Sequence, residues 1–225
     1  MSAGRTPMLK LYGHPFASFC WKALIALYER EVPFDFLMVD PEHPDNAAFV
    51  AQAAPTGQFP VLVDGARVVI ESAPIIEYLD LHHGAAAPLV PADPRAAIEA
   101  RQMDGVFDDY VMAPLTRMVL NRIRGAAHDP LADEEAQAVL DKAYAWLDLW
   151  MAERDWAACG RFTLADVAAG PALHYAHWGH PIAARHTALL AYRARLMAHP
   201  SIARVVDEAR PMRWMFPLKD NGSPD

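Results

Sequence analysis

The sequence has little of several features that whole classes of protein require. It has only two cysteines in 225 residues, Cys20 and Cys159, which cannot build the disulfide framework of a small secreted domain. No apolar run approaches the roughly 18 residues that a membrane-spanning helix needs, and the first residues lack the apolar segment of a secretory signal. These absences predict a cytoplasmic protein with reduced thiols and no membrane partner.

Positive charge is also scarce. The chain carries 20 Lys and Arg residues against 28 Asp and Glu residues, a net charge of -8, with a pI near 5.6. Because nucleic acid is bound through basic groups that neutralise phosphate, this balance disfavours a nucleic-acid partner. Apolar residues, by contrast, make up 53% of the chain, which is ample for a core. We therefore expect a globular protein with a small ligand.

The first eighty residues alternate between strand and helix patterns, in the order β-α-β-α-β-β-α. The expected elements are a strand at 9–12, a helix at about 17–29, a strand at 34–39, a short helix at 45–52, two strands within 61–70 and a helix capped by Ser72. An Asp-Gly pair at 64–65 joins the last two strands and is a strong hairpin signal.

A composition shift then separates this half from a purely helical one. Residues 83–94 contain three prolines and a glycine, which forbid a continuous helix. The helices expected beyond it span 95–122, 133–153, a buried helix opened by a capping box of Thr163 and Asp166, 188–197 and 201–209. The sequence therefore predicts a domain at 8–83, a linker at 84–94, a helical domain at 95–210 and a tail at 211–225.

Three short motifs give this layout an identity. Residues 57–62 read Gly-Gln-Phe-Pro-Val-Leu, residues 71–79 read Glu-Ser-Ala-Pro-Ile-Ile-Glu-Tyr-Leu, and residues 162–166 read Phe-Thr-Leu-Ala-Asp. Together with the layout, they resemble the cytosolic glutathione S-transferase family over roughly residues 8–210. The resemblance implies a thioredoxin-like βαβαββα domain followed by an all-helical domain, with glutathione as co-substrate and a homodimeric assembly.

The resemblance also implies a glutathione site. Its first motif carries a cis-proline, Pro60, which would expose the backbone of Phe59 to a peptide ligand, and its second places Glu71 and Ser72 at the γ-glutamyl group. Relatives often carry a cation at Gln58 for the glycyl carboxylate, so a neutral amide there predicts weaker binding or another cation. The residues alone also allow an ordinary trans-proline, a solvated Glu71 and a Ser72 that only caps its helix.

The chemistry requires a glutathione thiolate. A thiol with a pKa of about 8.5 is only about 3% ionised at pH 7, and lowering that pKa by ~2 units takes roughly 2.7 kcal/mol, which one hydroxyl at a helix N-terminus can supply. Ser18 is the candidate, although it could simply be the N-cap. Alignment with serine- or cysteine-type relatives puts their activating residue at Ala17, which has no hydroxyl, so Tyr12 is the alternative. We expect Cys20 to be a small buried hydrophobe.

The second substrate is expected against the first long helix of the helical half, between the domains. Tyr110, Met112, Arg117 and Trp178 are possible lining groups, although residues at helical spacing are more often core. The histidines at 174, 177 and 180 and the pair at 82–83 lack accompanying ligands at metal-binding spacing. We interpret them as helix-end and surface residues without a metal, and the charges at 122–124 and 133–135 as solvated helix ends.

Two functions remain in view. In the first, the protein conjugates the glutathione thiolate with a small hydrophobic electrophile, or isomerises a substrate through it. In the second, it only binds glutathione or hydrophobic ligands, an alternative favoured by Ala17 and Gln58. Redox chemistry through Cys20 is a poor third, because the Cys-x-x-Cys pattern that it would need has Ala17 in its first position.

Overall fold

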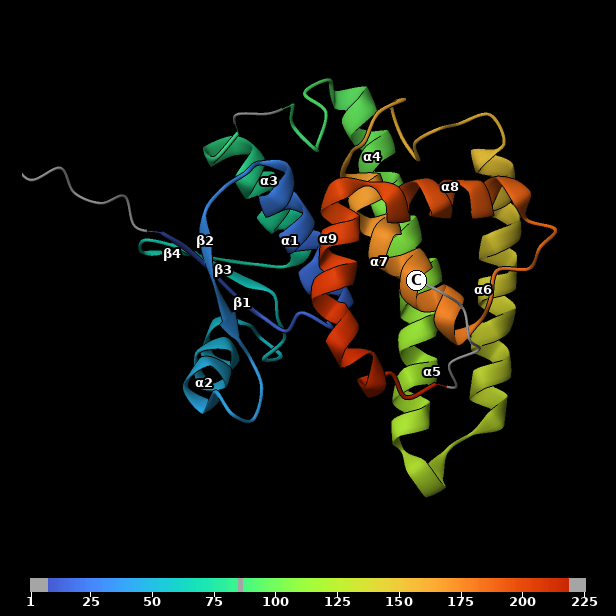
Figure 1. Cartoon of the computed structure of the whole chain (residues 1–225), viewed down its shortest axis with the longest axis horizontal. Coiled ribbons are helices and arrows are strands. Elements are labelled where there is room, and N and C mark those ends of the chain that lie inside the picture. The colour runs from blue at the N-terminus through green and yellow to red at the C-terminus, as the bar shows by residue number, and fades with distance from the viewer. Residues whose placement is uncertain (1–7, 85–86, 219–225) are drawn as a thin grey trace, which may run out of the picture. The chain divides into compact units, whose positions relative to one another are not determined.

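The computed structural model describes residues 8–84 and 87–218, and the chain divides into two compact units between Ala87 and Pro88 (Figure 1). This division falls inside the linker expected at 84–94. Residues 85–86 of that linker and 219–225 of the expected tail lie outside the described residues. Each unit is a folded body with its own elements.

The first unit has the expected thioredoxin-like order. Its elements are β1 (Leu9–Gly13), α1 (Ser18–Glu29), β2 (Phe34–Met38), α2 (Pro44–Ala53), β3 (Val61–Asp64), β4 (Arg67–Ile70) and α3 (Ser72–His82). The strands form one sheet in the order β2-β1-β3-β4, in which β1 and β2 are parallel and the other neighbouring pairs are antiparallel. The predicted fold class of this half is confirmed.

Local chemistry accounts for these elements. Gly65, with a φ of +57°, forms the turn between β3 and β4, a conformation that glycine adopts without steric cost. Every residue of α1 from Cys20 to Leu27 is buried, and α1 packs against α3. In Figure 1, α2 lies on the opposite side of the sheet from these two helices. Because β1 and β3 are antiparallel, with Tyr12 opposite Val61, the loop after β1 and the loop before β3 lie at the same end of the sheet.

The second unit is helical. Its elements are α4 (Pro94–Phe107), a π-helical turn η1 (Asp108–Met112), α5 (Ala113–Ile123), α6 (Pro130–Met151), α7 (Leu164–Gly179), α8 (Thr187–Ala198), α9 (Pro200–Ala209) and 3-10 turns at Gly125–Ala127 and Arg210–Met215. The helix predicted over 95–122 is present as α4, η1 and α5, which follow one another without a break, but its hydrogen bonds are not α-helical throughout. Pro114 has no amide hydrogen, and the Ala113 amide bonds the Asp108 carbonyl five residues back, so the helix widens at the proline.

Helix α7 is the buried centre of this unit, as its pattern predicts. Its capping box is formed, with the Thr163 amide donating to Asp166 Oδ2 at 2.9 Å. Asp166 Oδ1 accepts from the Ala157 amide at 2.9 Å and from the Tyr192 hydroxyl at 2.6 Å. Burial raises the pKa of Asp166, and these hydrogen bonds oppose the shift. One carboxylate thus joins the start of α7 to α8 and to the preceding loop.

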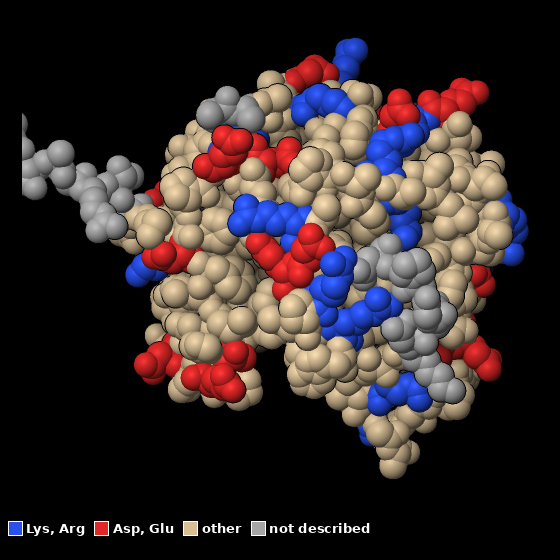
Figure 2. Space-filling model, viewed as in Figure 1, with Lys and Arg blue, Asp and Glu red and all other residues tan. Residues whose placement is uncertain are grey.

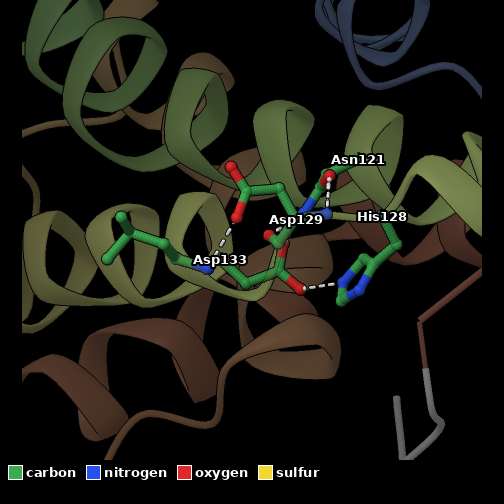
Figure 3. A network of polar contacts seen from close by, with 5 residues as sticks. Asn121, His128, Asp129 and Asp133 are labelled. Atoms are coloured by element: carbon green, nitrogen blue, oxygen red, sulfur yellow. Dashed lines mark hydrogen bonds and ion pairs between the residues drawn. The ribbon is translucent and has the colours of Figure 1, made fainter.

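The prediction that Asp133 is a solvated helix-end charge is wrong (Figure 3). Its side chain is 15% exposed and pairs with His128 Nε2 at 2.7 Å. It also accepts from Asn121 Nδ2 at 2.8 Å, and the Asn121 amide group exchanges hydrogen bonds with the backbone of Asp129. This network fastens the end of α5 to the beginning of α6.

Of the histidines expected at helix ends and on the surface, His177 and His180 lie at the end of α7, but His174 differs. His174 is 1% exposed, because α7 is buried on nearly all sides, and burial lowers its pKa well below the usual value. His177 accepts the Ile182 amide at 3.1 Å, and burial lowers its pKa to about 4. His180 bonds Asp141 at 2.9 Å.

Residues 8–84 and 87–218 contain no cluster of His, Cys, Asp and Glu suited to a metal ion. None of the helices found there combines the length and the apolar character that crossing a membrane demands.

Candidate functional site

The first part of the site is the turn that precedes β3. The Phe59–Pro60 peptide bond is cis, and Gly57, with a φ of +66°, turns the chain just before it. Because β3 begins only at Val61, the amide and carbonyl of Phe59 lie ahead of the β-ladder. The Phe59 ring packs on the core cluster below α2, which fixes this backbone. Gln58 is exposed, and its Oε1 accepts from the Thr56 hydroxyl at 3.0 Å.

The second part is the N-terminus of α3. The N-cap is Glu71 and not Ser72, which is the first helical residue, so the prediction that Ser72 caps this helix is wrong by one position. The first helical hydrogen bond joins the Ile75 amide to the Glu71 carbonyl, which leaves the Ser72 and Ala73 amides ahead of the ladder. Ser72 is 6% exposed, and its hydroxyl has no hydrogen-bond partner within the part of the chain that the structure describes.

The backbone at Glu71 is strained. Its φ of +69° and ψ of 133° lie in a region that side chains other than glycine rarely adopt, at a cost of order 1–3 kcal/mol. Such strain persists where the surrounding structure requires it, and it concentrates at binding sites. Here it brings Ser72 and its free amides to the end of β4. The sequence gives no signal of this conformation.

The third part is the N-terminus of α1. Ala17 is the N-cap, so the alternative reading of Ser18 as a simple cap is wrong. The Trp21 amide bonds the Ala17 carbonyl at 3.1 Å, so the amides of the first three helical residues precede the ladder. The Ser18 side chain is half-buried, and its hydroxyl is unpaired among the residues that are described. This helix start therefore also offers a hydroxyl and several amides to an anion.

Hydrogen bonds fix the loop between β1 and α1. They join Val39 N to Gly13 O (2.8 Å), Ala17 N to His14 O (3.0 Å), Trp21 Nε1 to Pro15 O (2.7 Å) and Phe16 N to His14 Nδ1 (3.2 Å). Burial lowers the pKa of His14, opposed by the charge of Asp40. No pattern in the sequence points to His14, whose one signal is a histidine next to a proline in a loop that leads into a helix.

Two other candidates of the first unit, Tyr12 and Cys20, pack against the protein interior. The Tyr12 ring stacks on Phe49 of α2 with 4.4 Å between centroids, and it packs against the cluster formed by Val50, Ala54 and Val61. Cys20 is fully buried, as expected, and burial raises the pKa of its thiol to about 12. Such a thiol is protonated at neutral pH and is a weak nucleophile.

The candidates of the second unit differ in exposure. Tyr110 lies in η1 and is 57% exposed, and Arg117 is an exposed residue 3.5 Å from Glu135. Met112 and Trp178 are buried, and the Arg213 guanidinium lies 4.4 Å from the centroid of the Trp178 ring. Tyr110 is therefore the most accessible apolar group among the four.

Charge does not favour an anionic ligand in the first unit. Residues 1–87 contain ten Asp and Glu residues against five Lys and Arg residues, a net charge of -5. Figure 2 shows acidic and basic side chains in small groups between wide uncharged areas. Of the basic residues, Lys22 and Arg30 are buried, and Arg30 is paired with Asp80. At the three parts of the site described above, the groups that can attract a carboxylate or a thiolate are hydroxyls and backbone amides.

Known proteins match both halves of the chain. A family model described as the glutathione S-transferase N-terminal domain matches residues 11–87. Glutathione S-transferase F6 of Arabidopsis thaliana is 27% identical over 180 residues, which are 74% of this chain and 83% of that protein. A further curated relative, a glutathione S-transferase of Pseudomonas putida, is 26% identical over 160 residues.

Solved structures of glutathione S-transferases are similar to this chain over most of its length. A glutathione S-transferase of Methylobacterium radiotolerans, in complex with glutathione sulfonate, has a TM-score of 0.76 and 27% identity and covers 97% of this chain and 99% of its own. A second one, from Methylobacillus flagellatus with glutathione bound, has a TM-score of 0.78 and 25% identity and covers 88% and 98%. Sequence, fold and matched domain thus agree, and the chain belongs to the glutathione S-transferase family.

Proposed function

We propose that this protein is a glutathione transferase that joins the glutathione thiolate to a small hydrophobic electrophile. The observation that carries the proposal is that α1 and α3 each begin with a serine, Ser18 and Ser72, whose hydroxyl is unpaired within the described residues. Both helices also begin with amides that precede the helical ladder. Two such helix starts suit two of the anionic groups of the bound molecule, the γ-glutamyl carboxylate and the thiolate.

Glutathione binding is assigned to the loops around β3. The backbone of Phe59, ahead of Pro60, pairs with the cysteinyl part of the tripeptide, and Ser72 with the amides behind it receives the γ-glutamyl carboxylate. Glu71 meets the ammonium group of the same residue. Gln58 receives the glycyl carboxylate through a neutral amide, which is weaker than a contact with a cation. The relatives with glutathione or its sulfonate bound support this ligand.

Thiolate activation is assigned to Ser18. Its hydroxyl donates to sulfur, which is worth about 1.5–3 kcal/mol for a charged acceptor, and the start of α1 adds about 0.3–1 kcal/mol. Together they approach the roughly 2.7 kcal/mol that lowers a thiol pKa by ~2 units. Tyr12 is the second candidate for activating the thiol, but its ring stacks on Phe49.

In the reaction, the thiol proton leaves to solvent, and sulfur forms a bond to the electrophilic carbon as the leaving group departs with its electron pair. Tyr110 is proposed to contact the electrophile with its exposed ring. Arg117 is a weaker candidate for this role, because its guanidinium already faces Glu135. The protein is proposed to act in the cytoplasm as a homodimer, as the resemblance to its family implies.

One observation favours a second function, the binding of glutathione without catalysis. The N-cap of α1 is Ala17, so no hydroxyl stands at the position that relatives of the serine type use. If Ser18 does not reach the sulfur, the two helix starts still form a binding site but leave the thiol protonated.

The variant Ser18→Ala separates the two functions. As a transferase, the protein with this substitution should lose at least about tenfold in conjugation rate, equivalent to about 1.4 kcal/mol, while calorimetry still detects glutathione binding. Ser72→Ala is the matched variant and should weaken binding instead. Unchanged turnover in Ser18→Ala would remove Ser18 from the mechanism, and a wild-type protein that binds glutathione but never conjugates it would favour the binder. No heat of binding with the wild-type protein would overturn both.

A further inference from the structure

One of the hydrogen bonds described for the loop before α1 uses a titratable side chain. The others described there are accepted by the carbonyls of Gly13, His14 and Pro15, which do not change charge between pH 4 and 9. The Phe16 amide differs, because it donates to the ring of His14 at 3.2 Å. This contact spans two residues and holds the turn that ends at Ala17, one position before Ser18.

We propose that His14 is a positioning residue, whose ring nitrogen Nδ1 holds the Phe16 amide and thereby keeps Ser18 placed for the glutathione thiolate. The inference rests on the proposed function and adds a residue to it. An amide can only donate, so Nδ1 must be the unprotonated nitrogen, and the neutral ring carries its proton on Nε2. Protonation would place an N–H group against the Phe16 N–H, and the contact would be lost.

The surroundings of His14 keep the ring neutral at physiological pH. Burial lowers its pKa, and Asp40 in the loop after β2 opposes this shift. Asp40 is itself engaged, since it accepts from His43 Nδ1 at 2.7 Å and from the Glu42 amide at 2.9 Å. From α1, the Cys20 thiol faces the His14 backbone and is protonated, because burial raises its pKa to about 12. The loop is therefore intact at neutral pH and opens only in acid.

Two variants test this contact. Asparagine at position 14 can accept from the amide two residues ahead, as Asn side chains do in Asx turns, and it does not titrate. His14→Asn should therefore keep the wild-type rate at neutral pH, and its Phe16 amide should stay protected from exchange at acidic pH, where the wild type loses that protection. His14→Ala has no acceptor and should lower kcat/KM about five- to tenfold, the loss expected for one hydrogen bond. His180→Asn, a change at the end of α7, is the matched control and should leave activity and its pH profile unchanged.

Two readouts separate this inference from the proposed function. The first is hydrogen exchange at the Phe16 amide, which needs no glutathione: exchange should be slow in the wild type and in His14→Asn, and about fivefold or more faster in His14→Ala. The second is the pKa of bound glutathione, followed by ultraviolet difference absorbance, which should rise in His14→Ala.

Exchange rates that are equal in all variants would overturn the role of His14 in the loop. Slow exchange together with an unchanged thiol pKa in His14→Ala would overturn its link to Ser18. The Phe16 amide could also exchange as expected in a protein that never ionises glutathione. That result would refute the proposed function and the link to Ser18, and only the hydrogen bond between His14 and Phe16 would stand.

Discussion

The hydrogen bonds of Asp166 make a sharp prediction for stability. This carboxylate is fully buried and accepts from the Thr163 and Ala157 amides at 2.9 Å each and from the Tyr192 hydroxyl at 2.6 Å. The variant Asp166→Ala removes all of these acceptors at once. Two backbone amides, the Tyr192 phenol and the Thr163 hydroxyl, which donates to Asp166 Oδ2 at 3.2 Å, then lose this acceptor in the interior of the second unit.

The size of the effect follows from these contacts. A hydrogen bond to a charged group contributes about 1.5–3 kcal/mol to stability, and leaving a buried donor without an acceptor costs about 1–3 kcal/mol. These energies do not add fully within one network. We therefore expect Asp166→Ala to lower the free energy of unfolding by about 4 kcal/mol. In a chain of this length, that corresponds to a fall of roughly 8–16 °C in Tm.

Urea denaturation followed by tryptophan fluorescence measures this loss. Asp207→Ala, on an exposed side chain of α9 that pairs with Arg210, is the matched control and should cost less than about 0.5 kcal/mol. Tyr192→Phe should cost about 1–2 kcal/mol alone and much less in the Asp166→Ala background, because the hydroxyl has then lost its acceptor. A loss below about 1 kcal/mol in Asp166→Ala would refute the reasoning.

Two further predictions concern other contacts. In Gly13→Ala the new Cβ would lie 2.6 Å from the Cys20 sulfur, so the free energy of unfolding should fall by about 1–3 kcal/mol. Adding Cys20→Ala to this variant should restore most of the lost stability in denaturation curves. A double variant that is no more stable than Gly13→Ala would show that the clash with Cys20 is not the cause. Burial alone would raise the pKa of Asp133, but hydrogen bonds from Asn121 and His128 outweigh it and lower that pKa. The stability from this carboxylate is therefore present above its usual pKa of about 3.9 and lost as pH falls through the lower folded value. Asp133→Asn should be less stable than the wild type at pH 7 by about 1 kcal/mol, with a difference that shrinks in acid, whereas the exposed Glu135→Gln should show no such trend.

Most of the fold could be predicted because its signals are local. The hairpin follows from an Asp-Gly pair, and the capping box of α7 from Thr163 and Asp166 three residues apart. The apolar spacing of residues 17–29 also predicts α1, although every residue from Cys20 to Leu27 is buried and not one face alone. In these places, neighbouring residues fix the backbone, and the tertiary structure agrees with them.

The errors arise where the outcome depends on contacts that a pattern does not carry. The helical spacing over 95–122 predicts the helix but not the wider backbone at η1, where the Ala113 amide bonds the Asp108 carbonyl five residues back. Asp133 reads as a solvated charge until the turn between α5 and α6 brings Asn121 against it. His174 reads as a surface residue until α7 is enclosed by its neighbours.

The candidate site divides in the same way. The sequence motifs identify Ser18, Ser72 and Pro60, because each stands at the boundary of an element with a clear pattern. They do not identify which residue caps a helix, since this depends on φ and ψ, and both caps lie one residue earlier than the serines. Nor do they identify His14, because a ring that accepts an amide two residues ahead has no periodic signature.

The two helix starts also explain how an acidic unit can suit an anionic ligand. The first unit has a net charge of -5, but exposed charges are screened beyond about 8–10 Å at physiological ionic strength. A hydroxyl or an amide in contact with a carboxylate acts at hydrogen-bond distance, where little solvent intervenes, and each helix start adds a partial positive charge of about half a unit. In the proposed site we therefore expect the local groups at Ser18 and Ser72 to set the affinity for glutathione, and the net charge of the unit to have little influence on it.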